Sequence, residues 1–180
     1  MSCLDLRPPG RLFLRLLRPL RLFRPVRVLC ALWATAALLP AHAAPRAVEV
    51  FDRPAWGALQ AGLTAPAIVV FTATYCAHCP AVMAQLAQDK RRLQPSAQLI
   101  AVVMDAVPGD DDAKLLRDPH HRPLDRLFAF QGQAAALRHA VDPSWRGITP
   151  YVAFLHPGEP PRWVTGPPKA QDLAAWARKR

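Results

Sequence analysis

The chain has 180 residues, of which 52% are apolar, so it is not wholly disordered and is long enough for one domain plus an appendage. The net charge of +10 is unevenly spread: residues 1–43 hold seven arginines and one acid, whereas residues 44–180 hold 16 basic and 12 acidic residues. The body is only mildly basic. Nucleic acid is therefore not expected as a partner, because nucleic-acid-binding domains gather basic residues densely on one face.

The first 43 residues have the three parts of a secretory signal peptide. Arginines recur from Arg7 to Arg27, an apolar run spans residues 28–39, and residues 41–43 (Ala-His-Ala) form a small-x-small cleavage site. Cleavage there predicts an exported mature domain of residues 44–180. The apolar run is short against the roughly 20 residues that a membrane-spanning helix needs. The alternative is a retained segment that anchors the domain, with its Arg- and Leu-rich part lying on the membrane surface.

The rest of the chain alternates between short apolar runs and stretches with helical spacing. The apolar runs predict strands at residues 47–51, 67–73, 98–104, 151–155 and 162–164. The helical spacing predicts helices at residues 53–62, from the second cysteine of the pair described below to about residue 93, at 125–140 and at 170–178. Asp52 and Asp125 are the expected caps of two of these helices, and residues 113–122 are ambiguous. This order predicts a three-layer α/β/α sandwich with a mixed central sheet.

Two cysteines stand two residues apart where an apolar strand meets a helix. The run that ends at Ala73 leads through Tyr75 into Cys76-Ala77-His78-Cys79. The N–H groups at a helix N-terminus lack partners and carry a partial positive charge, so a thiolate is favoured there over a thiol. The spacing predicts a redox site in which Cys76 is the exposed nucleophile. Cys79, one helical turn further in, would resolve the mixed disulfide.

Other uses of this cysteine pair are less well supported by the sequence. Zinc needs four ligands, and the pair supplies two, with only distant candidates in His120, His121 and His156. Covalent haem requires a histidine directly after the second cysteine, where proline stands. A periplasmic Cu(I) carrier remains an alternative, since soft thiolates favour Cu(I). Its candidate ligands are Cys76, His78, Cys79 and Met83.

Most of these residues also have a structural interpretation. Met83 falls on the apolar side of its helix, where a methionine is usually core filler. His120, His121 and His139 are expected at the surface. Cys3 and Cys30 lie in the segment that is expected to be removed, so Cys76 and Cys79 would be the only thiols of the mature domain. No cofactor and no resident metal is expected for a redox site of this kind.

The predicted order of elements resembles the thioredoxin fold over nearly the whole mature part. The aromatic residue before the cysteine pair, Thr149-Pro150 at the start of a later strand, and the closing hairpin and helix carry the resemblance. Residues 142–155 are similar to thioredoxin-like reductases related to cytochrome-c maturation. The Thr149-Pro150 pair and the C-terminal tail also resemble the catalytic domain of periplasmic disulfide isomerases. Val70 stands where cytoplasmic thioredoxin has a buried acid.

The resemblance implies a periplasmic thiol:disulfide oxidoreductase acting on protein thiols and disulfides, monomeric, and recharged by a membrane or soluble redox partner. Ala77 and His78 would modulate the cysteine pair, and oxidising members of the family carry a histidine at the second of these places. Thr149, a cis Pro150 and Tyr75 would contact the substrate. The residues leave the direction of electron flow open between oxidase, reductase and isomerase.

Overall fold

A computed structural model describes residues 44–178 of the chain. Six strands form one sheet in the order β1-β4-β3-β2-β5-β6. The strands are β1 (Val48–Phe51), β2 (Ala67–Thr72), β3 (Gln98–Val103), β4 (Arg126–Phe130), β5 (Tyr151–Leu155) and β6 (Arg162–Thr165). Strands β1, β4, β3 and β2 run parallel to one another. Strand β5 is antiparallel to β2, and β6 is antiparallel to β5.

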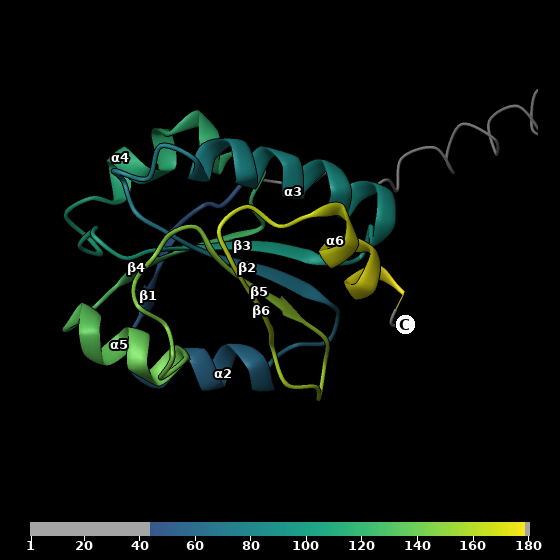
Figure 1. Cartoon of the computed structure of the whole chain (residues 1–180). Coiled ribbons are helices and arrows are strands. Elements are labelled where there is room, and N and C mark those ends of the chain that lie inside the picture. Colours follow the sequence, from purple (N-terminus) through teal and green to yellow (C-terminus); the bar gives the residue numbers. More distant parts are fainter. Residues whose placement is uncertain (1–43, 179–180) are drawn as a thin grey trace, which may run out of the picture. The chain divides into compact units, whose positions relative to one another are not determined.

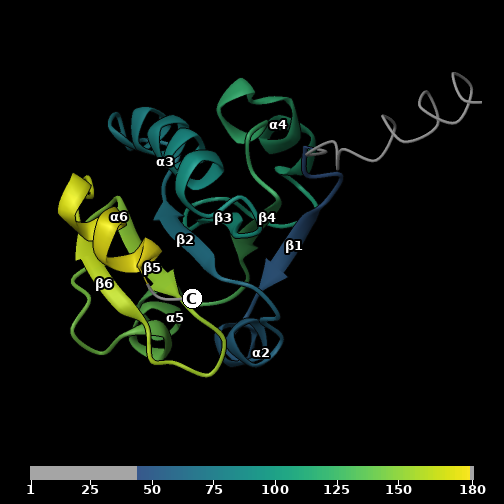
Figure 2. The same cartoon turned by 90° about the vertical axis from the view of Figure 1, so that its right-hand side faces the viewer.

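Helices cover both faces of the sheet (Figure 1). They are α2 (Ala55–Ala61), α3 (Cys79–Leu93), α4 (Asp112–Arg117), α5 (Ala134–Val141) and α6 (Ala170–Ala177), with a short 3₁₀ helix η1 at Pro119–His121. Helices α2 and α5 lie on one face, and α3, α4 and α6 lie on the other. Figure 2 shows β1 at one edge of the sheet and the β5–β6 hairpin at the other. The predicted three-layer α/β/α sandwich with a mixed central sheet is confirmed.

The core is built on β2 and β3, the two central strands. Every residue of β2 is buried, and its side chains alternate between the two layers. Ile68 and Val70 pack in the layer under α3 and α6, whereas Val69 and Phe71 pack in the layer under α2 and α5. Because successive side chains of a strand point to opposite faces, a continuously apolar strand fits only where both faces are covered. The strand that leads to the cysteine pair is therefore held on both sides.

The predicted helix at residues 125–140 is wrong in its first half. Residues 126–130 form β4, a strand between β3 and β1, and the helix begins only at Ala134, after Gly132 with a φ of 122°. The side chains from Leu127 to Phe130 are all buried in β4. A short, continuously apolar run fits a buried strand and a buried helix equally well. The sheet thus has six strands rather than the five that the sequence predicts.

The two predicted helix caps are also wrong. Helix α2 begins after Pro54 and has no side-chain cap, and Asp52 contributes only its backbone carbonyl, which accepts the Ala55 N–H at 3.2 Å. Asp125 precedes a strand. Its carboxylate accepts the Leu99 N–H at 2.6 Å and forms an ion pair with Lys90, whose side chain is 2% exposed. Asp125 therefore ties α3 to the start of β3 and β4.

Residues 113–122, which the sequence leaves ambiguous, form most of α4 and all of η1. His120 and His139 are exposed, as expected, but His121 is buried, with 7% of its surface accessible. The expectation of a surface position for His121 is wrong because η1 turns this ring inward, where its Nδ1 lies 2.8 Å from the Leu115 carbonyl oxygen.

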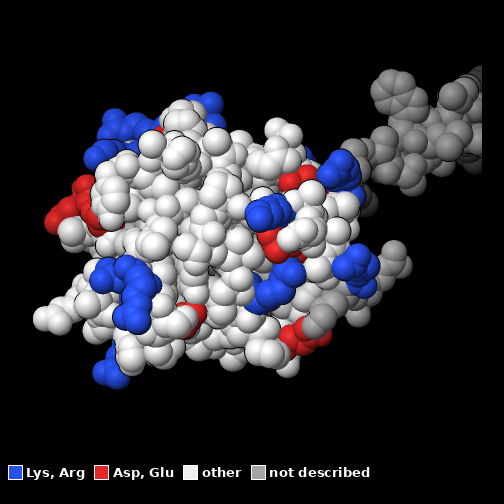
Figure 3. Space-filling view, viewed as in Figure 1, with Lys and Arg blue, Asp and Glu red and all other residues white. Residues whose placement is uncertain are grey.

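The predicted signal peptide, with Cys3 and Cys30, lies outside the described residues. Within residues 44–178, none of the helices has the length and apolar character of a membrane span. On the face in Figure 3, lysine and arginine side chains form separate small groups with acidic side chains between them. A dense basic surface is not seen on that face.

Candidate active site

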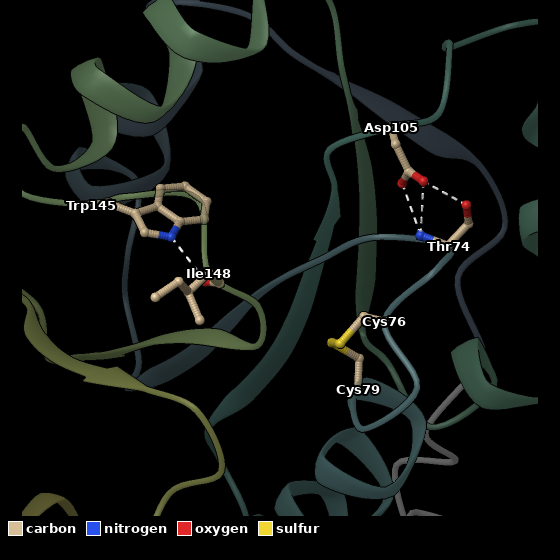
Figure 4. Close-up of a disulfide and its surroundings, with 6 residues drawn as sticks. All are labelled: Thr74, Cys76, Cys79, Asp105, Trp145 and Ile148. Atoms are coloured by element: carbon tan, nitrogen blue, oxygen red, sulfur yellow. Dashed lines mark hydrogen bonds between the residues drawn. A yellow bond between two sulfur atoms is a disulfide. The ribbon is translucent and has the colours of Figure 1, made fainter.

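Cys76 and Cys79 form a disulfide in front of α3, with their Cα atoms 5.5 Å apart (Figure 4). Strand β2 ends at Thr72, and α3 begins at Cys79, with Pro80 within its first turn. The loop is tightly turned, because the Cys76 N–H donates to the Ala73 carbonyl at 3.0 Å and the Cys79 N–H donates to the Cys76 carbonyl at 3.2 Å. Cys79 is thus the first residue of α3, where the sequence predicts this helix to begin.

The two sulfur-bearing residues differ in exposure. Cys76 is half-buried, whereas Cys79 is 1% exposed and belongs to the core. An external thiolate can therefore reach the Cys76 side of the disulfide, and Cys79 is shielded by the protein. Cys76 Sγ can therefore react with external thiols, whereas Cys79 Sγ can react only within the chain.

Asp105 holds the front of the cysteine loop through Thr74. The Asp105 carboxylate accepts the Thr74 N–H at 2.8 and 3.1 Å and the Thr74 hydroxyl at 2.5 Å (Figure 4). Asp105 follows β3, the strand next to β2, so the ends of two neighbouring parallel strands place the two residues together. Thr74 and Asp105 are 31 positions apart in the sequence, which explains why local pattern could not reveal this contact.

We expect Asp105→Ala to loosen this loop. The carboxylate accepts both donors of Thr74, so its loss should cost about 1 kcal/mol of unfolding free energy, the usual net value of an exposed hydrogen-bonded group. Amide hydrogen exchange at residues 74–76 should speed up more than exchange in the core of α3. Asp110→Ala, an exposed change in the loop that follows, is the matched control and should leave both quantities unchanged. Unchanged exchange at Thr74 in the Asp105 variant would contradict this role.

Thr149 and Pro150 lie at the start of β5, with a cis peptide bond between them. Pro150 is buried and its carbonyl accepts the Gly166 N–H at 2.8 Å, whereas Thr149 is half-buried. Among the described residues, neither the N–H nor the C=O of Thr149 has a hydrogen-bond partner. The preceding residue, Ile148, is 57% exposed. This loop therefore offers a free backbone edge next to an exposed apolar side chain.

Trp145 and Tyr151 help to hold the loop at Ile148 and Thr149 in place. The Trp145 indole N–H donates to the Ile148 carbonyl at 3.0 Å (Figure 4). The two rings stack with centroids 4.7 Å apart, and Tyr151 stacks in turn on Trp163 at 4.9 Å. The Tyr151 hydroxyl donates to Asp142 at 2.5 Å, and this bond holds the pKa of Asp142 below its ordinary value. Burial, with help from Asp142, raises the pKa of Tyr151.

Tyr75 precedes the first cysteine and His78 precedes the second, and both residues are exposed. Tyr75 is 74% exposed. His78 is exposed at the N-cap of α3 and lines a groove of about 330 Å³ between α3 and the start of α6. Pro167, Pro168 and Leu173 form much of the far wall of this groove. Ala77 is exposed between the cysteines.

A second cavity, of about 250 Å³, lies on another side of the disulfide. Its polar and sulfur-bearing lining includes Cys76, Cys79, Met83, Lys114, Asp118, His120 and His121. Met83 is 2% exposed and packs in the core, as expected for core filler. The sequence suggested His120 and His121 only as distant zinc ligands and gave no indication of Asp118, and only the Asp-Pro-His-His sequence could have drawn attention to this group. Within residues 44–178, no three His, Cys, Asp or Glu side chains are grouped closely enough to hold a metal ion.

No protein-family model and no curated protein sequence matches the chain. The chain is similar to a secreted Mycobacterium tuberculosis disulfide oxidoreductase homologous to E. coli DsbE, with 17% identity, a TM-score of 0.47, and coverage of 68% of this chain and 85% of that chain. It is also similar to the N-terminal domain of PilB from Neisseria gonorrhoeae, with 16% identity, a TM-score of 0.48, and coverage of 67% and 80%. A third similar structure is the thioredoxin domain of a Bacteroides vulgatus thiol-disulfide oxidoreductase, with 14% identity, a TM-score of 0.47, and coverage of 68% and 81%.

Proposed function

We propose that this protein is an exported thiol:disulfide oxidoreductase that exchanges its Cys76–Cys79 disulfide with the cysteines of other proteins. The observation that carries the proposal is the disulfide at the start of α3, with a half-buried Cys76 and a buried Cys79. A disulfide that only stabilised the fold would have no need of one accessible sulfur. Disulfides that are accessible on one side are the ones that thiolates attack.

The exchange runs through a mixed disulfide. In the oxidising direction, a substrate thiolate attacks Cys76 Sγ, a new S–S bond forms, and Cys79 leaves as a thiolate. A second substrate thiolate then attacks the substrate sulfur of the mixed disulfide and releases Cys76. The substrate loses two electrons and the cysteine pair gains them. In the reducing direction, Cys76 attacks a substrate disulfide and Cys79 resolves the intermediate.

The substrate backbone is proposed to lie along Thr149. An extended chain needs a free N–H and C=O to pair with, and Thr149 offers both among the described residues. Tyr75 and Ile148, both exposed, would contact apolar side chains of that segment. Such contacts recognise the backbone and apolar side chains of a substrate and do not require a particular substrate sequence. This kind of recognition suits a protein that acts on many substrates.

His78 is proposed to set the reduction potential of the Cys76–Cys79 disulfide. A positive charge near Cys76 stabilises its thiolate, and a more stable reduced form makes the disulfide a stronger oxidant. We expect the reduction potential to lie above that of thioredoxin, about −270 mV. In His78→Ala, the potential should fall by on the order of 30 mV, which corresponds to about 1.4 kcal/mol. Equilibration with glutathione measures it, and His139→Ala, an exposed change on α5, is the control. An unaltered potential in the His78 variant would show that His78 does not set the reduction potential of the cysteine pair.

Residues 1–43 are proposed to be a signal peptide that directs export to the periplasm, with the mature chain starting at Ala44. The basic segment, the short apolar run and the small-x-small site support this proposal. N-terminal sequencing of the protein recovered from the periplasm tests it. Recovery of the uncleaved chain in the membrane fraction would instead support the anchored form.

The function is tested on the purified mature domain, residues 44–180, which we propose to be a monomer. Catalysed reduction of insulin by a thiol, or oxidation of a reduced peptide by the disulfide form, is the expected result. Failure of both reactions would overturn the proposal. Tight, stoichiometric Cu(I) binding to the reduced domain together with such failure would support a copper carrier. The redox state of the cysteine pair in intact cells gives the direction, since a steady disulfide indicates an oxidase.

A further inference from the structure

The proposed exchange, on which this inference rests, requires the Cys79 thiol to lose a proton. Only the thiolate attacks a disulfide, yet Cys79 is almost entirely shut off from bulk water. The strand beneath it supplies no base, because β2 reads Ala-Ile-Val-Val-Phe-Thr and is buried throughout. Val70 in particular occupies the core between the sheet and α3. The proton must therefore pass into the cavity that Cys79 shares with α4 and η1.

Four titratable side chains besides the cysteines line this cavity: Lys114, Asp118, His120 and His121. A lysine ammonium has no lone pair and cannot accept a proton. The Asp118 carboxylate already accepts the His120 backbone N–H at 2.9 Å and faces the His120 Nδ1 at 2.8 Å. Although burial alone raises the pKa of Asp118, the His120 N–H and the nearby His121 hold it below its ordinary value, so Asp118 is a weak base. The two imidazoles are the remaining acceptors.

His121 is the imidazole whose orientation suits this task. Its Nδ1 lies 2.8 Å from the Leu115 carbonyl, which can only accept, so Nδ1 carries the proton and a neutral ring keeps its lone pair on Nε2. Among the described residues, Nε2 has no hydrogen-bond partner, while no fully buried side-chain nitrogen or oxygen lacks one. Nε2 is therefore not fully buried, and His121 lines the same cavity as Cys79. His120, by contrast, is 53% exposed and turns Nδ1 to Asp118.

We propose that His121 Nε2 accepts the proton of the Cys79 thiol, either directly or through one water in the cavity. The Cys79 thiolate then attacks Cys76 Sγ, the Cys76–Cys79 bond forms, and the substrate sulfur leaves as a thiolate. In the opposite direction Cys79 leaves as a thiolate, and the His121 imidazolium returns the proton. The cavity of about 250 Å³ has room for such a water.

The test separates the two steps of exchange. The reduced mature domain is mixed with oxidised glutathione, quenched with acid, and followed by mass spectrometry as the mixed disulfide at Cys76 forms and then closes to the Cys76–Cys79 disulfide. His121→Asn keeps an amide donor for the Leu115 carbonyl but has no base. We expect attack by Cys76 to change less than twofold and closure to slow at least tenfold, since general base catalysis commonly contributes roughly 10²–10⁴-fold.

The pH profile distinguishes proton transfer from a purely structural role. In the wild type, closure should become independent of pH once the base is in its neutral form. In His121→Asn it should keep rising with hydroxide concentration. His139→Asn, exposed on α5, is the matched control and should behave as the wild type. Slow closure in His120→Asn with normal closure in His121→Asn would assign the proton to the other ring and overturn the proposal.

Failure of the proposed function and failure of the role of His121 give different results. If the reduced wild type forms no mixed disulfide at all, the proposed function fails and this inference fails with it. If the mixed disulfide forms and His121→Asn closes it at the wild-type rate with the wild-type pH profile, only the role of His121 is overturned. Should His121→Asn not fold, nitrogen NMR of the wild-type ring decides: an Nε2 signal that shifts when the disulfide is reduced supports the proposal, and an unresponsive one overturns it.

Discussion

Replacing Cys79 by serine is expected to abolish turnover while leaving the first attack intact. Cys76 remains half-exposed and able to form a mixed disulfide, but the serine hydroxyl cannot resolve it. The mixed disulfide with a protein substrate should therefore accumulate and survive non-reducing electrophoresis. Insulin reduction by the variant should fall to the uncatalysed rate. This is the largest effect on activity that the site predicts, together with that of Cys76→Ser.

Cys76→Ser is the matched partner of this experiment. It should lose the mixed disulfide as well as the turnover, because Cys79 is too deeply buried to meet an external disulfide. Equal accumulation of mixed disulfides in both variants would show that the two sulfurs are equally accessible, contrary to the structure. Substrates trapped by Cys79→Ser in the periplasm would also identify the proteins on which this domain acts.

Asp125→Asn is expected to produce the largest loss of stability. Its carboxylate is the ion-pair partner of Lys90, which is 2% exposed, and it also accepts the Leu99 N–H. An asparagine can keep the hydrogen bond to Leu99 but leaves the ammonium buried without a counter-charge. Removing one member of a buried ion pair typically costs about 3–5 kcal/mol, and the partial exposure of Asp125 places the expected cost near the lower value.

Urea unfolding followed by tryptophan fluorescence measures this effect. Asp110→Asn, an exposed change of the same chemistry, should alter the unfolding free energy by less than about 0.5 kcal/mol. Combining Asp125→Asn with Lys90→Met should recover part of the loss, because the uncompensated charge is then removed. If the double variant is less stable than the sum of the two single effects predicts, the penalty does not come from the buried ammonium.

The cysteine pair and its setting could be read from local pattern. An apolar run bounded by breakers predicts a buried strand, and a helical stripe after Cys79 predicts a helix, because each depends on residues within one or two turns. The predicted strands at 67–73 and 98–104 accordingly lie within one residue of β2 and β3. The same reasoning failed at residues 126–130, where a run of five residues is too short to show a helical or strand period.

The surroundings of the disulfide could not be read in this way. Asp105 meets Thr74 because β2 and β3 are neighbours in the sheet, and the two residues are 31 positions apart. Trp145, Tyr151 and Trp163 stack because β5 and β6 pair and the loop before β5 folds over them. His121 joins Cys79 in one cavity because η1 packs beside α3. Each contact depends on the order of strands, which short-range periodicity does not encode.

By itself, the sequence determined that two cysteines stand at the front of a helix, that a buried strand leads to them, and that an α/β sandwich surrounds them. These properties follow from residue spacing, which acts over a few positions. Only the tertiary structure decided how completely Cys79 is buried, that the backbone N–H and C=O of Thr149 have no partner within residues 44–178, and that a histidine shares the cavity of the buried sulfur. Burial and proximity belong to the packed chain, because they arise when distant segments exclude water from one another.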